Sequence, residues 1–200
     1  IELGLKNTLF NNHARLNLTD FYTRLVDAQV PTLLLPDVIT IIQNRGKLNS
    51  KGIELEFTAK ANTHLSIDYN AGFTHARFEK LEIAQNGTSN IFNGNKQIFT
   101  PDVVSNLALQ YDQKLKNHLT AFVRTEWKYI GTTYFDLANS IQQSPYSIFN
   151  ASVGFNMGNL NMKYWSRNLT NQKYIAYAYD FGAIHLGDPV TNGCSIALKF

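Results

Sequence analysis

The chain has 200 residues, of which 44% are hydrophobic and 16% are charged, and its formal net charge at pH 7 is +3. Its Lys and Arg residues are scattered along the sequence rather than gathered in a stripe, which argues against binding to nucleic acid. The single cysteine, Cys194, excludes an internal disulfide and any cluster of cysteine metal ligands.

Alternation of apolar and polar residues predicts two β-strands at the start of the chain, over residues 1–9 and 14–30. A tight turn at Asn11-Asn12 joins them. The alternation changes at residues 20–21, which predicts a β-bulge that redirects the side chains. Residues 31–36 begin and end with proline and predict a loop.

The clearest strand is predicted over residues 53–60, because apolar and polar residues strictly alternate there. A short turn at 62–63 joins it to a strand over 65–74. Residues 80–99 are polar and carry two Asn-Gly pairs, so they predict a long loop. Four further strands show the same alternation: residues 103–111, 119–129, 148–155 and 160–164.

The last predicted strand covers residues 190–200. It places four residues on one face, namely Cys194, Ile196, Leu198 and Phe200, and mostly small or polar residues on the other. This pattern is equally typical of a membrane-spanning strand that ends in an aromatic residue and of a half-buried edge strand in a soluble domain.

The connections between these nine strands alternate in length. Short turns are predicted near residues 11, 63, 115 and 158, and longer loops near 33, 90, 140 and 182. Short turns at one end and long loops at the other are typical of outer-membrane barrels, whose strands face lipid on one side and a polar lumen on the other. An odd number of strands cannot close an antiparallel barrel, so we expect the chain to be part of a longer protein.

Several short motifs resemble the carboxyl-terminal part of TonB-dependent outer-membrane receptors. They are Lys51–Glu56, Pro101-Asp102-Val103, Ser144-Pro145-Tyr146 with Phe149-Asn150, Arg167–Asn171 with Tyr174, and Gly187-Asp188-Pro189 before a strand that ends in Phe200. Together they span nearly the whole chain. The stretch Asn95–Pro101 is similar to members that import iron siderophores.

The resemblance implies an all-β, antiparallel transmembrane β-barrel of about 22 strands with a plugged lumen. Residues 1–200 would supply about nine carboxyl-terminal strands of this one domain. A plug domain and a TonB-binding segment would lie upstream, and the barrel-assembly machinery would recognise Phe200. The expected function is import of a scarce ligand, a ferric siderophore, across the bacterial outer membrane with energy from the TonB complex. Two alternatives stay open, a passive porin or adhesin barrel and a soluble all-β binding domain.

Five charged residues lie on the predicted polar faces of two strands: Glu54, Glu56, Arg124, Glu126 and Lys128. In a barrel these side chains would point into the lumen. They would either contact the plug and line the transport path, or pair with one another as a hydrated barrel wall.

Loop aromatics grip ligand in the family, so the resemblance makes Tyr177, Tyr179 and His185 candidate substrate-binding residues. The alternative is anchoring at the lipid interface or simple packing of the loop. The sequence has no nucleophile motif such as G-x-S-x-G, and no His at metal-ligand spacing with a carboxylate or Cys. It therefore predicts neither an enzyme, nor a metal site, nor a cofactor.

Overall fold

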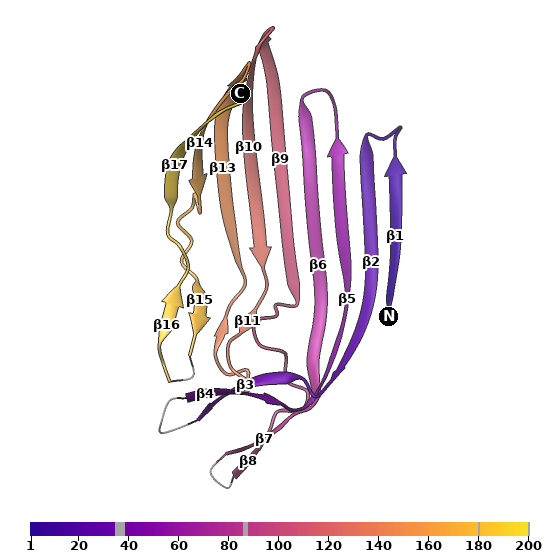
Figure 1. Ribbon diagram of the computed structural model, residues 1–200, viewed down its shortest axis with the longest axis vertical. Coiled ribbons are helices and arrows are strands. Elements are labelled where there is room, and N and C mark those ends of the chain that lie inside the picture. The colour runs from indigo at the N-terminus through magenta and orange to yellow at the C-terminus, as the bar shows by residue number, and fades with distance from the viewer. Residues whose placement is uncertain (35–38, 86–87, 180, 200) are drawn as a thin grey trace.

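The computed structural model describes residues 1–34, 39–85, 88–179 and 181–199. Its main element is a sheet of nine antiparallel strands that follow one another along the chain, with small hairpins between them (Figure 1). The nine strands are β1 (Glu2–Leu9), β2 (Ala14–Val26), β5 (Lys47–Lys60), β6 (Leu65–Lys80), β9 (Val103–Lys116), β10 (Leu119–Ile130), β13 (Tyr146–Met157), β14 (Leu160–Arg167) and β17 (Thr191–Leu198). The predicted all-β, antiparallel fold is confirmed. Within the described ranges the structure has no helix that is long and apolar enough to cross a membrane.

The register of the strands gives the sheet one polar and one apolar face. Directly paired residues in an antiparallel sheet point to the same side. One polar row therefore crosses six strands: Arg15, Thr58, Asp68, Ala108, Glu126 and Asn150. One apolar row also crosses six strands, from β6 to β17: Leu65, Tyr111, Val123, Val153, Tyr164 and Cys194. The two faces predicted from the sequence thus stay separate across neighbouring strands.

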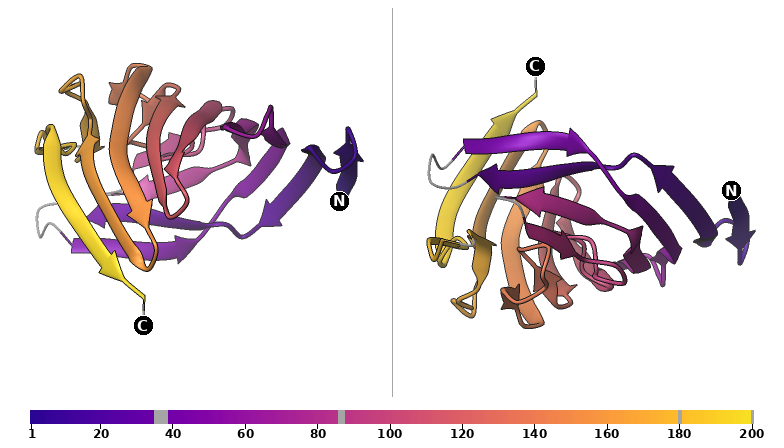
Figure 2. Two further views of the ribbon diagram at one scale, coloured as in Figure 1. Left: turned by 90° about the horizontal axis from the view of Figure 1, so that it is seen from above. Right: turned by 90° about the horizontal axis from the view of Figure 1, so that it is seen from below.

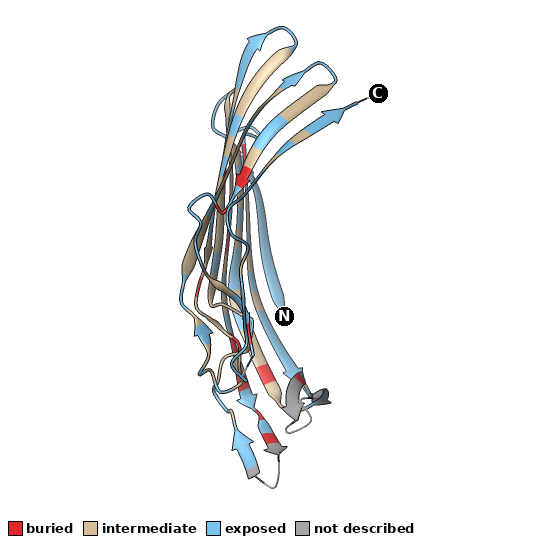
Figure 3. Cartoon of the chain, turned by 90° about the vertical axis from the view of Figure 1, so that its left-hand side faces the viewer, coloured by how far each residue is buried: buried red, intermediate tan, exposed pale blue. Residues whose placement is uncertain are grey.

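None of the described residues forms a second layer over the apolar face. The sheet is strongly curved, and its edge strands β1 and β17 lie far apart (Figure 2). Val153 on this face is 54% exposed and Ile196 is 68% exposed. Figure 3 shows the consequence, since most of the sheet is coloured as exposed or intermediate and little of it as buried. A large exposed apolar surface of this kind marks a face that meets lipid or another protein.

All short turns lie at one end of the sheet and all long connections at the other (Figure 1). We call these the turn end and the loop end. Each long connection holds a two-stranded hairpin, where the sequence predicted loops without strands. The hairpins are β3 (Gln29–Leu34) with β4 (Ile39–Asn44), β7 (Glu82–Gln85) with β8 (Thr88–Ile91), β11 (Thr133–Tyr134) with β12 (Gln142–Gln143), and β15 (Ile175–Ala178) with β16 (Ile184–Leu186).

A small hydrophobic core lies at the loop end. Its buried members are Val30, Leu48, Phe78, Leu81 and Ile83. Leu48 pairs with Phe78 across β5 and β6, and Gly52 pairs with Thr74 on the same two strands. Each member of the first pair lies four residues from a member of the second, an even number, so all four residues are on the same face. Leu48 and Phe78 therefore lie on the polar face of the sheet. The connections therefore fold inward over the polar face, and Figure 2 shows the β3–β4 hairpin on the concave side.

Two local predictions for the start of the chain are wrong. The strand that was expected to reach residue 30 ends at Val26, and Asp27 has a positive φ of 57°. The bulge expected at residues 20–21 is absent, because the register between β2 and β5 is continuous. The alternation changes there because Phe21 lies on the polar face above Gly52, where a Cβ atom would lie 2.7 Å from the Phe21 ring.

Candidate functional site

The five charged residues predicted for the lumen all lie on the polar face. Glu56 belongs to the row that continues through Asn70 and Asn106 to Lys128. Glu126 lies in the next row on the same face. Arg124 lies in the row beyond Glu126, and Glu54 lies in the row on the other side of Glu56. The sheet thus gathers charges from β5 and β10, although β6 and β9 separate these strands. Their role in contacting a plug stays a prediction.

Arg124 is the centre of an ion-pair cluster on this face. Its Nε donates to Oε1 of Glu126 at 3.0 Å, and its Nη1 lies 3.5 Å from Oδ2 of Asp68. Asn150 Nδ2 donates to the second oxygen of Glu126 at 3.4 Å. This geometry favours the alternative in which the charges pair along a hydrated wall. Asp68 was not among the candidates, because its partner comes from a strand distant in sequence.

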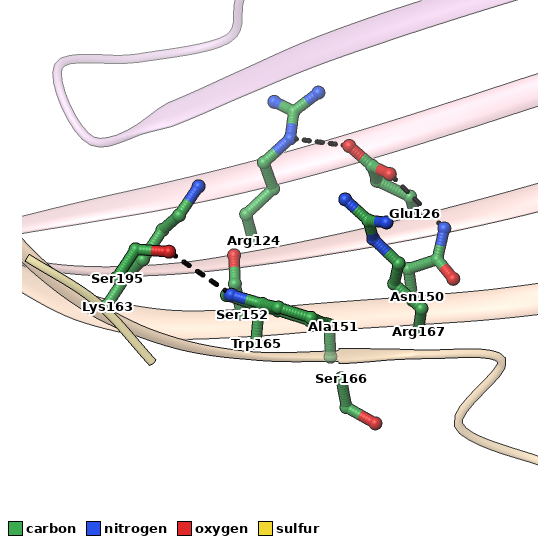
Figure 4. A pocket seen from close by; sticks show the side chains of 10 residues that line it. All are labelled: Arg124, Glu126, Asn150, Ala151, Ser152, Lys163, Trp165, Ser166, Arg167 and Ser195. Carbon is green, nitrogen blue, oxygen red and sulfur yellow. Dashed lines mark hydrogen bonds and ion pairs between the residues drawn. The ribbon is translucent and has the colours of Figure 1, made fainter. Parts of the chain in front are cut away.

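A pocket of about 400 Å³ opens beside this cluster (Figure 4). It is lined by Arg124 and Glu126 and by three larger side chains of β14, namely Lys163, Trp165 and Arg167. The indole Nε1 of Trp165 donates to Ser195 Oγ at 3.2 Å, and the Arg167 guanidinium lies 4.9 Å from the centre of the indole. The pocket therefore combines three cations with one carboxylate, and it suits contact with an acidic partner or with water.

The loop end carries a second candidate site, a row of contacting aromatic rings, some stacked and some tilted, that we call the aromatic ladder. Its members are Phe135, Phe99, Tyr177, Tyr179 and Phe181. The successive ring centres lie 5.7, 5.0, 4.5 and 5.0 Å apart. These residues come from three different connections, so folding brings them together. Aromatic pairs at such distances stabilise each other and leave an amphipathic surface for a ligand.

Backbone contacts hold the ladder in place. Phe99 has a positive φ of 56°, and its N–H donates to the carbonyl of Tyr134 at 2.9 Å. Lys96 and Asn139 exchange two hydrogen bonds nearby, of 2.7 and 3.1 Å. The amide of Ile175 donates to Gln143 Oε1 at 2.7 Å, which attaches the β15–β16 hairpin to its neighbour.

The candidate ligand residues are placed differently from one another. Tyr177 and Tyr179 both belong to the ladder. His185 is exposed and pairs with Tyr177 across the hairpin. The sequence missed Phe99 and Phe135, because only the contact between connections reveals them. Phe200 lies outside the described residues, so its role in assembly stays a prediction.

The described ranges contain no group of three or more His, Cys, Asp or Glu side chains that could hold a metal ion. The polar face and the ladder can bind a ligand or a partner through charge, hydrogen bonds and aromatic contact. Both sites offer chemistry suited to recognition, and the aromatic one lies at the loop end.

Comparisons with known proteins agree with this architecture. A family model for the TonB dependent receptor-like β-barrel matches residues 1–171. The ferrioxamine receptor of Yersinia enterocolitica is 30% identical over 153 residues, which cover 71% of this chain and 19% of that protein. The pesticin receptor of Yersinia pestis is 24% identical over 170 residues, which cover 84% of this chain and 24% of that protein.

The fold matches solved receptor structures. The ferric yersiniabactin uptake receptor of Yersinia pestis superposes with a TM-score of 0.81 at 22% identity, over 100% of this chain and 29% of that one. A siderophore receptor of Acinetobacter baumannii gives a TM-score of 0.80 at 22% identity, over 100% of this chain and 28% of that one. This chain thus spans less than a third of the length of each of these relatives. With a family model that covers most of its length, the chain belongs to the TonB-dependent receptor β-barrel family.

Proposed function

We propose that the chain is part of an outer-membrane receptor that imports a ferric siderophore with energy from the TonB complex. The observation that carries the proposal is the division of the nine-stranded sheet into a polar and an apolar face, with every long connection at one end. Membership of the family and the likeness to a ferrioxamine receptor support the substrate class.

In this proposal the apolar face meets outer-membrane lipid and the polar face lines a lumen. Strands from the rest of the protein would continue the sheet from β1 and β17 and close the barrel. The loop end would face the outside of the cell and the turn end the periplasm, as in bacterial barrels of this kind.

The polar face would pack against a plug domain of the same protein. The paired charges, such as Arg124 with Glu126, would form a hydrated part of this wall beside the plug, because they already have partners. The pocket beside Trp165 carries more cations than carboxylates and would accept acidic side chains of the plug. The TonB complex would act through a segment outside this chain, and the barrel-assembly machinery through the last strand.

Uptake of iron by living cells tests the proposal. The complete receptor would be expressed in a Gram-negative strain that lacks its own siderophore receptors, and growth on ferrioxamine as the sole iron source would be measured. We expect growth with intact TonB and none in the same strain without TonB. Growth that is independent of TonB would identify a passive barrel instead, and recovery of the protein in the soluble fraction without detergent would contradict both barrel functions.

A further inference from the structure

Cations gather at one end of the apolar face. In β5 and β6, every second residue over 53–59 and 65–73 lies on this face, and all of them are uncharged. Beyond Ile53 and Phe73, towards the loop end, the same face changes character. The next rows across β2, β5 and β6 carry five cations: Arg24, Lys47, Lys51, Arg77 and Lys80. We call this set, together with Lys96, the basic patch.

The register places these cations side by side. Lys51 pairs with His75, and Arg77 is two residues further along β6 on the same face. A bridge between Arg77 and Lys96 brings the sixth cation into the same row. Lys51 and Arg77 are thus diagonal neighbours on adjacent strands, a placement with about 7–8 Å between the two residues. Two long side chains at that spacing can reach the same phosphate group.

Carboxylates neutralise only part of the basic patch. Arg24 is paired with Glu79 at 2.9 Å, and Lys96 is paired with Asp102. Asp20, on the same face one row nearer the turn end, adds a third carboxylate. Among the described residues no ion pair is recorded for the other four cations, namely Lys47, Lys51, Arg77 and Lys80. Six cations beside three carboxylates leave this end of the face positive and attractive to anions.

Hydrogen bonds orient donors on the patch. Arg77 Nε donates to His75 Nε2 at 3.1 Å, and Arg77 Nη1 donates to the carbonyl of Gly94 at 2.6 Å. A neutral His75 whose Nε2 accepts a hydrogen bond carries its proton on Nδ1. His75 and Lys51 are both exposed. An oxyanion could therefore accept from Lys51 Nζ, from His75 Nδ1 and from the second terminal nitrogen of Arg77.

A lipid that carries phosphate groups matches this surface as a whole. Ile53 and Phe73, which border the patch, are 46% and 53% exposed and would contact acyl chains. The cations lie directly beyond them, at the level where the headgroups of that leaflet would lie. Arg and Lys bind phosphate through charge-assisted hydrogen bonds. An acidic protein would match the cations alone, whereas a lipid matches the cations and the apolar rows beside them.

We propose that the basic patch binds the phosphate groups of a lipid in the outer leaflet, with Lys51, His75 and Arg77 around one phosphate. The inference rests on the proposed placement in the outer membrane and does not depend on which ligand is imported. The positions of β10, β13 and β14 on the apolar face carry no charged residue. The lipid is therefore held at one side of the sheet, beside β2, β5 and β6, and not along its whole width.

Binding of matched lipids to the complete receptor in detergent tests the site, with native mass spectrometry as the measurement. The probes are lipid A with two phosphates and the same lipid A after removal of both phosphates. We expect the phosphorylated lipid to bind at least about tenfold more tightly, as one or more charge-assisted contacts would give. Equal binding of the two lipids would overturn the proposal. Displacement of lipid A by inorganic phosphate at the same concentration would also overturn it, in favour of a site for a free anion.

Two variants at one position and a matched control locate the site. Lys51→Gln should weaken binding of phosphorylated lipid A by roughly fivefold, the contribution of one cation at an anionic membrane surface. Lys51→Arg keeps the charge and should keep the affinity. Lys116→Gln is the control, because Lys116 is exposed and pairs with Leu119, which puts it on the same face at the turn end. Equal weakening by Lys51→Gln and Lys116→Gln would show that the lipid responds to net charge, and the patch would lose its role.

Growth on ferrioxamine separates this inference from the proposed function. Cells with the Lys51→Gln receptor should grow like those with the native receptor, because Lys51 lies on the face opposite to the lumen. If the native receptor supports TonB-dependent growth but binds both lipids equally, the lipid site fails and the import function stands. If the preference for phosphorylated lipid A is present without TonB-dependent growth, the import function fails and the lipid site stands.

Discussion

Trp165 and Gly193 lie directly opposite each other on β14 and β17, and the indole ring covers the glycine. A Cβ atom on Gly193 would lie 2.4 Å from Cζ2 of Trp165, closer than two carbon atoms approach without a clash. The absence of a side chain therefore lets the large ring lie across the last strand pair on the polar face. Its hydrogen bond to Ser195 depends on this position.

Replacing Gly193 by Ala should displace the indole of Trp165 and break its hydrogen bond to Ser195. We expect a loss of about 1–3 kcal/mol in the free energy of unfolding, the usual cost of overpacking a close contact. Urea unfolding of the complete receptor in detergent, followed by tryptophan fluorescence, measures the change. Gly4→Ala is the control, because the nearest atom to a Cβ there, Thr19 Oγ1, is 3.9 Å away. Equal destabilisation by both variants would show that the indole contact is unimportant.

An arginine on the apolar face should be far more harmful than one on the polar face. Val123 lies in the apolar row and is 44% exposed, so Val123→Arg would place a charge in lipid. Near the middle of the bilayer the expected cost is about 2–4 kcal/mol. Thr58→Arg on the polar face should cost little, because Thr58 pairs with Asp68 across β5 and β6. Unfolding from lipid vesicles compares the two, and equal costs would contradict the assignment of the faces.

The sequence predicts the main sheet well because its information is local. Period-two alternation needs no knowledge of distant residues, so the strands and their faces follow from it. The pattern is misleading where a large residue faces the polar side, as Phe21 does above Gly52. The hairpins at the loop end were missed for a related reason, since Ile39–Ile42 in β4 is almost continuously apolar and does not alternate.

The candidate sites depend on contacts between distant segments, and the sequence predicts them only in part. The charges of the polar face follow from alternation, but the ion pair between Arg124 and Asp68 requires the order of the strands. Tyr177 and Tyr179 were suggested by the family resemblance, whereas the stacking of Tyr177 on Phe99 is a tertiary contact. A cavity at the loop end that Asp27 lines carries no sequence motif, because its walls come from five separate segments of the chain.

Labelling of single cysteines on whole cells should establish the orientation of the barrel. In a Cys194→Ser background, Asn90→Cys places a thiol in the β7–β8 hairpin at the loop end, and Thr63→Cys places one in a turn at the opposite end. Both positions are exposed. Position 63 is preferable to Asn62, whose Oδ1 accepts hydrogen bonds from the amides of His64 and Leu65. We expect an impermeant maleimide to label position 90 and to leave position 63 unlabelled until the cells are opened. The reverse pattern would invert the proposed topology.

Asn168 should control the connection that carries Tyr177 and Tyr179. Its side chain is 4% exposed, and Nδ2 donates to the carbonyls of Gln172 and Asp188, both at 2.9 Å, while Oδ1 accepts from the amide of Gln172 at 2.8 Å. These bonds join the two ends of the connection. Asn168→Ala removes all three and leaves the carbonyls of Gln172 and Asp188 without this donor, which costs about 1–3 kcal/mol for each group that neither water nor another partner then satisfies.

The loss should appear first as local opening, because connections open at lower free energy than the strands of the sheet. We expect faster proteolysis within residues 168–190 and weaker binding of the proposed ferric siderophore, with little change in unfolding of the main sheet. Thr170→Ala is the control, since Thr170 is exposed in the same connection. Limited proteolysis with mass spectrometry locates the cuts. If Asn168→Ala is cut at the same rate as the control and binds the chelate normally, these hydrogen bonds do not position the aromatic ladder.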